Sequence, residues 1–107
     1  AHTYGVSLDA DTEILPLIGS KEGITHVSLT FLNEADGVLV PELGYPAYRA
    51  VSQMVGASVL TYPLLENQGW QPDWSAMADL ITPTTKIVWL NYPHMPTGAP
   101  ATQALFE

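Results

Sequence analysis

The chain has 107 residues, and 11 acidic against 3 basic residues give it a formal net charge of -8. We expect no nucleic-acid partner and no anionic membrane surface, because binding to either depends on clustered lysine and arginine. The sequence contains no cysteine, which excludes disulfides, a thiol nucleophile and a cysteine metal site.

Apolar residues make up 47% of the chain, whereas charged residues make up only 13%. This balance favours a packed core over disorder, and it predicts that further chain or a partner covers part of the surface. No stretch approaches the roughly 18 apolar residues of a membrane span, and the beginning of the chain has no secretory signal pattern. The absence of cysteine is compatible with the cytoplasm, which is the expected location.

The first part of the chain combines an irregular segment with a helix. Residues 1–12 predict an irregular beginning. Residues 13–18 predict an edge strand or an irregular extended piece, because Pro16 interrupts their apolar run. The helical spacing of apolar side chains predicts a helix over residues 21–32, with Ser20 as its N-cap.

Strands and helices alternate over the rest of the chain. Proline at the start and glycine at the stop delimit a predicted helix over residues 46–56. Asp73 is expected to cap a short helix that runs through Ile81, and its buried side is expected to carry Trp74, Met77 and Ile81. The remaining predicted elements are strands over residues 38–40, 57–62 and 87–90, a proline-rich loop over residues 91–98, and a last helix from Ala101 onward.

This alternation predicts an α/β fold with a mainly parallel sheet. Ligands of such sheets bind beyond the carboxyl ends of the strands. Three loops fall at positions of that kind, namely residues 19–22, 41–46 and 91–98. These loops are therefore the candidate functional segments.

The first of them is the sequence Gly-Ser-Lys-Glu-Gly at residues 19–23, which leads into a predicted helix. Free backbone N–H groups and the helix dipole make such a start suitable for an anion. Lys21 opposes the dipole at a cost of about a few tenths of a kcal/mol, and a bound phosphate or carboxylate would reverse that effect. The alternative is an ordinary capped helix with a solvated lysine.

The other two loops carry a rigid aromatic residue and a histidine. Tyr45 lies between Gly44 and Pro46 after a buried strand, which suits it for stacking on a flat ligand ring or for packing over the sheet edge. His94 is a candidate base, but no carboxylate close in sequence orients it, which favours a structural hydrogen-bond role. His2 and His26 have no metal-ligand spacing with it.

Three segments resemble, in order and spacing, the class I and II aminotransferases, the fold-type I enzymes that use pyridoxal 5′-phosphate. They are TEILPLIGSKEGITH, VLVPELGYPAYRA and LNYPHMPTGA. The resemblance runs nearly end to end, and the segments are most similar to the LL-diaminopimelate and alanine aminotransferase-like branch of the family. The resemblance implies a three-layer α/β/α fold in which residues 1–107 form part of the large, cofactor-binding domain.

The resemblance also implies roles for individual residues. Ser20 and Lys21 match positions that bind the phosphate of the cofactor, and Tyr45 matches the aromatic residue that stacks on its pyridine ring. Met95 stands where the family motif N-P-T-G has an asparagine that hydrogen-bonds the cofactor's 3′-oxygen, and methionine cannot donate that bond. Either His94 or Asn91 replaces the missing donor, or the electronics of the cofactor differ.

The resemblance finally implies what the segment lacks. The Schiff-base lysine, the rest of the large domain and the small C-terminal domain lie outside it, so we expect no catalytic residue here and no activity of the segment alone. The complete protein is expected to be a homodimeric aminotransferase of amino-acid biosynthesis that acts on an amino acid and a 2-oxo acid. The alternatives are a C–S lyase, a decarboxylase or a regulatory domain of the same fold, or an acidic interaction module without a cofactor.

Overall fold

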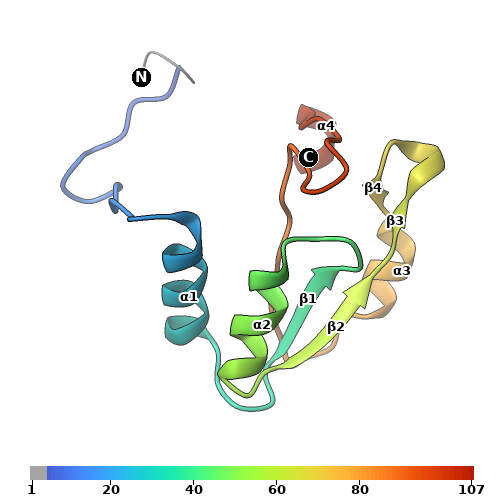
Figure 1. Cartoon of the computed structure of the whole chain (residues 1–107), viewed down its shortest axis with the longest axis horizontal. Helices are drawn as coiled ribbons and strands as arrows, with labels where there is room; N and C mark the ends of the chain where they lie inside the picture. Colours follow the sequence, from blue (N-terminus) through green and yellow to red (C-terminus); the bar gives the residue numbers. More distant parts are fainter. Residues whose placement is uncertain (1–4) are drawn as a thin grey trace.

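The computed structural model describes residues 5–107, and its elements alternate as the sequence predicts (Figure 1). Residues 1–4, which include His2 and the start of the predicted irregular segment, lie outside the described part. In chain order the elements are α1 (Ser20–Phe31), β1 (Gly37–Pro41), α2 (Pro46–Met54), β2 (Ser58–Tyr62), β3 (Leu64–Leu65), the 3-10 turn η1 (Glu66–Gln68), β4 (Gln71–Pro72), α3 (Trp74–Asp79), β5 (Thr85–Val88) and α4 (Gln103–Phe106).

The main sheet has three parallel strands in the order β2-β1-β5. The central strand β1 is buried along its whole length, as expected for an apolar strand with neighbours on both sides. Its register pairs Val38 with Val59 of β2 and with Ile87 of β5. The predicted parallel sheet is therefore confirmed.

Helices cover both faces of this sheet. Side chains of β1 alternate between the faces: Val38 and Val40 pack in one apolar cluster with Ile24 of α1 and Tyr48 of α2. Leu39 belongs to a second cluster, against which α3 packs. Figure 1 shows α1 and α2 on one side of the strands and α3 on the other. The arrangement is a three-layer α/β/α fold.

Two predicted helix starts have different outcomes. Asp73 caps α3 as predicted, since its Oδ1 accepts a hydrogen bond from the Ala76 N–H at 3.0 Å. The prediction of Ser20 as the N-cap of α1 is wrong, because the extended residue Gly19 is the N-cap and Ser20 is the first helical residue. No side chain caps the N-terminus of α1, which leaves its first N–H groups available.

The other differences concern short elements. The antiparallel pair β3–β4 was not predicted, because its strands have two residues each and carry no periodic signal. Trp74 and Ile81 were expected to be buried, but they are 43% and 53% exposed. Ile81 is exposed because α3 ends at Asp79, before it is reached. Of the expected set, Met77 packs against the core.

None of the helices within residues 5–107 has the length and apolar character that crossing a membrane requires.

Candidate functional site

The candidate site lies at the end of the sheet where β1 finishes. The loop of residues 41–46 connects β1 to the N-terminus of α2 at this end, and α1 also begins there (Figure 1). Two helix N-termini therefore lie near the carboxyl end of a central parallel strand. That is the usual place for a ligand in an α/β sheet.

The N-terminal turn of α1 offers hydrogen-bond donors. Ser20 and Lys21 are exposed, and the Ser20 hydroxyl makes no capping bond. The Glu22 carboxylate instead accepts a hydrogen bond from the Ile18 N–H at 2.7 Å, which fixes the chain just before the helix. The open N–H groups, the hydroxyl and the Lys21 ammonium form a donor set that suits an anion such as phosphate.

Tyr45 is held in place by its neighbours in the loop and in α2. A Cβ at Gly44 would lie 2.6 Å from Pro41 Cγ, so only glycine fits this turn without rearrangement. The Tyr45 ring meets the Tyr48 ring edge-on, with 5.8 Å between centroids and an interplanar angle of 84°. Tyr48 in turn stacks on Trp89 at 4.9 Å and 15°. The aromatic chain of these three residues gives Tyr45 a rigid backing.

Lys21 and Tyr45 lie in one hollow, which we call the Lys21–Tyr45 hollow. Its volume is about 410 Å³, and Thr25 and Val51 also line it. The Lys21 Nζ lies 5.8 Å from the centroid of the Tyr45 ring, within the range of a cation–π contact. The structure therefore brings together two of the four residues singled out in the sequence, from loops that are separated by a whole helix and strand.

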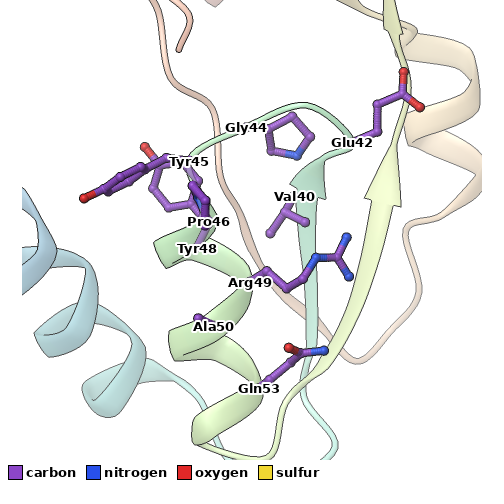
Figure 2. Close-up of a pocket in the computed structure, with 10 residues that line it drawn as sticks. Val40, Glu42, Gly44, Tyr45, Pro46, Tyr48, Arg49, Ala50 and Gln53 are labelled. Carbon is purple, nitrogen blue, oxygen red and sulfur yellow. The ribbon is translucent and has the colours of Figure 1, made fainter. Parts of the chain in front are cut away.

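A second cavity, of about 380 Å³, lies on the other side of α2 and is also bordered by Tyr45. Figure 2 shows that Arg49 and Gln53 point toward the strands, whereas the rings of Tyr45 and Tyr48 point the opposite way. Arg49 is therefore directed away from the Lys21–Tyr45 hollow. It belongs to a different surface of the domain.

The side chains of the proline-rich loop, residues 91–98, do not line the Lys21–Tyr45 hollow. Met95 is 45% exposed and lines neither cavity. His94 is buried at 3% exposure, and its Nδ1 lies 2.8 Å from the Thr97 hydroxyl. Burial lowers the pKa of His94 below the ordinary value of 6.5. His94 therefore has the structural hydrogen-bond role that the sequence favours, and it does not face the hollow as a donor.

The supporting aromatic residues were not identified as site residues from the sequence. Tyr48 follows Tyr45 at a spacing of three residues on a helix, which is a signal for mutual contact. No comparable signal connects Trp89 to Tyr48, because that contact depends on the pairing of β1 with β5. Within residues 5–107 no group of three His, Asp or Glu side chains is arranged to hold a metal ion.

Comparison with known proteins gives a consistent result over the whole chain. Residues 1–107 match the family described as aminotransferase class I and II. The chain is 46% identical over 104 residues to an LL-diaminopimelate aminotransferase of Dehalococcoides mccartyi, and 41% identical to that of Aquifex aeolicus. Each alignment covers 97% of this chain and 27% of the relative, so the chain spans little more than a quarter of the length of these curated relatives.

Solved structures agree with the sequence relatives. The N-succinyldiaminopimelate aminotransferase from Mycobacterium tuberculosis superposes with a TM-score of 0.87 at 34% identity, covering 96% of this chain and 27% of that chain. The fold and the sequence therefore point to the same group of proteins.

Proposed function

The chain belongs to the aminotransferase class I and II family, and on this premise we propose that the complete protein is a pyridoxal 5′-phosphate-dependent aminotransferase. It moves an amino group between an amino acid and a 2-oxo acid in amino-acid biosynthesis. Because the curated relatives named above are LL-diaminopimelate aminotransferases, the proposed amino donor is LL-diaminopimelate or a similar diamino acid.

The observation that carries this proposal is the shared hollow of Lys21 and Tyr45. Pyridoxal phosphate has a dianionic phosphate and a flat pyridine ring. The donors at the start of α1 suit the phosphate, and the Tyr45 ring suits the pyridine ring. The residues present therefore fit the cofactor in type. When bound, the cofactor supplies the aldehyde carbon and the electron sink that the transfer of an amino group needs.

Each residue has a distinct proposed role. Ser20 and Lys21 hold the phosphate through backbone N–H groups, a hydroxyl and an ammonium group. Tyr45 packs on one face of the ring, and Tyr48 keeps Tyr45 from tilting. Met95 stands at the position of the family asparagine that hydrogen-bonds the cofactor's 3′-oxygen, and its side chain has no donor for that bond.

The catalytic groups belong to the rest of the complete protein. Lys21 and Lys86 are the lysines of this chain. Lys21 is assigned to the phosphate, and Lys86 lies exposed on β5. We therefore expect no turnover from residues 1–107 alone. In the proposed complete protein, these residues form part of the large domain of a cytoplasmic homodimer.

The test is an assay of the complete protein, purified and loaded with pyridoxal phosphate. We expect LL-diaminopimelate and a 2-oxo acid to give the transaminated products, and removal of the cofactor to abolish turnover. Release of carbon dioxide or of a thiol from amino-acid substrates, without formation of a new amino acid, would show that the protein is a decarboxylase or a C–S lyase and not an aminotransferase. No binding of the cofactor at all would contradict the proposal as a whole.

A further inference from the structure

Among residues 5–107, four tyrosines lie at the carboxyl ends of the three parallel strands. Tyr45 and Tyr48 follow β1, Tyr62 is the last residue of β2, and Tyr92 follows β5. This edge of the sheet is the usual place for a ligand. The hydrogen-bond partner of each hydroxyl therefore shows whether that hydroxyl serves the fold or is available to a ligand.

Two of these hydroxyls are bound to backbone carbonyls. The Tyr62 hydroxyl donates to the Trp89 carbonyl at 2.7 Å, and the Tyr92 hydroxyl donates to the Trp70 carbonyl at 2.6 Å. The residues joined are 27 and 22 positions apart in the sequence, so each bond fastens one segment of the fold to another. Tyr62 and Tyr92 thus use their hydroxyls for the fold.

Tyr48 differs from them, because its ring is buried while its hydroxyl has no partner. The side chain is 8% exposed, packs in the core cluster that contains Val40, and stacks on Trp89 at 4.9 Å. Within residues 5–107 its hydroxyl forms no hydrogen bond, and its oxygen is not one of the fully buried polar atoms. Burial raises the pKa of Tyr48, and the neighbouring Tyr45 raises it further. The hydroxyl is therefore protonated at neutral pH, reaches the surface and is free to donate.

This free hydroxyl belongs to a ring that lies beside Tyr45. The Tyr48 ring meets the Tyr45 ring edge-on, with 5.8 Å between the centroids and an interplanar angle of 84°. Figure 2 shows both rings on the same side of α2, away from Arg49. The parallel ring of Trp89 fixes the plane of Tyr48 from below. Packing thus holds a polar group of Tyr48 next to the aromatic residue that is proposed to stack on the cofactor.

We propose that Tyr48 is a further cofactor-binding residue, whose hydroxyl hydrogen-bonds a polar atom of the pyridine ring that stacks on Tyr45. This inference rests on the proposed function, because it needs the cofactor in the Lys21–Tyr45 hollow. The phosphate is assigned to Ser20 and Lys21, so the polar groups left for Tyr48 are the ring nitrogen and the ring oxygen. A phenolic hydroxyl both donates and accepts, which suits either group.

The experiment uses the complete protein and two readouts. One is the dissociation constant, measured for pyridoxal phosphate and for pyridoxal, which lacks the phosphate. The other is the free energy of unfolding of the cofactor-free protein in chemical denaturation. Tyr48→Phe keeps the ring and its stacking on Trp89 but removes the hydroxyl. Tyr62→Phe is the matched control, because it removes a neighbouring hydroxyl that the fold uses.

We expect Tyr48→Phe to weaken binding of both compounds by about three- to tenfold, the effect of losing one hydrogen bond. The stability of the cofactor-free variant should be unchanged, since the hydroxyl contributes no bond to the fold. Tyr62→Phe should show the reverse pattern, with lower stability and unchanged dissociation constants.

Wild-type affinity of Tyr48→Phe for both compounds would overturn the inference. A loss for pyridoxal phosphate alone would also overturn it, because the hydroxyl would then act at the phosphate. A cofactor-free Tyr48→Phe variant as destabilised as Tyr62→Phe would overturn it as well, since the hydroxyl would then be bonded to the rest of the complete chain. Failure of the proposed function has a different signature: the wild-type protein itself would bind neither compound, and the inference would fail with it.

Discussion

Replacing Lys21 by methionine separates the stability of the fold from the affinity for the cofactor. Methionine keeps an unbranched side chain of similar length but removes the ammonium group that lies over the Tyr45 ring. Lys86→Met is the matched control, because it removes the same charge from an exposed position on β5. Both variants are compared in the complete protein with and without pyridoxal phosphate.

The expected effect on the fold is small because two contributions oppose each other. A positive charge in the first turn of α1 destabilises the helix by about 0.3–1 kcal/mol. The cation–π contact with Tyr45, at 5.8 Å, returns about 0.5–1 kcal/mol at an exposed site. Lys21→Met should therefore change the free energy of unfolding of the cofactor-free protein by less than about 1 kcal/mol.

The expected effect on binding is larger and depends on the phosphate. A hydrogen bond between charged groups contributes about 1.5–3 kcal/mol, and each 1.4 kcal/mol is about a factor of ten in the dissociation constant. Lys21→Met should weaken binding of pyridoxal phosphate by about one to two orders of magnitude. Binding of pyridoxal, which lacks the phosphate, should be nearly unchanged.

The assay is a titration of the cofactor-free variants with each compound, followed by absorbance or tryptophan fluorescence. An equal loss of affinity for both compounds would refute the reasoning, because Lys21 would then act on the ring or on the fold. A loss in Lys86→Met as large as that in Lys21→Met would refute it as well, since net charge alone would explain the effect.

Three further predictions address the rest of the site and its support. Met95→Asn restores the donor of the family motif, and it should tighten binding of pyridoxal phosphate by about tenfold or more; equal or weaker binding in a titration would show that residue 95 does not reach the cofactor. Tyr62→Phe removes the hydroxyl that donates to the Trp89 carbonyl at 2.7 Å, and because that group is buried it should lower the free energy of unfolding by about 1–2 kcal/mol in chemical denaturation, whereas unchanged stability would mean that the bond does not form. Because the pKa of His94 lies below its unfolded value of 6.5, the unfolded chain binds more protons at moderately acidic pH, so stability should be complete above pH 6.5 and fall as the pH drops through the folded pKa. The same measurement on His94→Asn should give a shallower fall, and an identical pH dependence would contradict the assignment of a neutral histidine.

The sequence predicted the larger elements because each carries a strong local pattern. The apolar strand at residues 38–40 and the helix between Pro46 and Gly56 are marked by composition and by their end residues. The pair β3–β4 was missed because two-residue strands have no measurable period. The start of α1 was displaced by one residue because Gly19 and Ser20 are both acceptable N-caps, and only the backbone distinguishes them.

The candidate site could be predicted only in part for a similar reason. Lys21 and Tyr45 were noticeable because a lysine at a helix start and a tyrosine between glycine and proline are locally unusual. Trp89 and the burial of His94 were not predictable, because both depend on how β5 pairs with β1 and on what covers the proline-rich loop. Local chemistry thus identified the residues that face the hollow, and tertiary contacts determine which residues hold them there.

The most direct measurement of the central claim is a crystal structure of the complete protein with pyridoxal 5′-phosphate bound. We expect phosphate oxygens to lie at hydrogen-bond distance, about 3 Å, from the first-turn N–H groups or side chains of Ser20 and Lys21, and the pyridine ring to lie against Tyr45. A phosphate bound away from the N-terminus of α1, or a pyridine ring without contact to Tyr45, would contradict it.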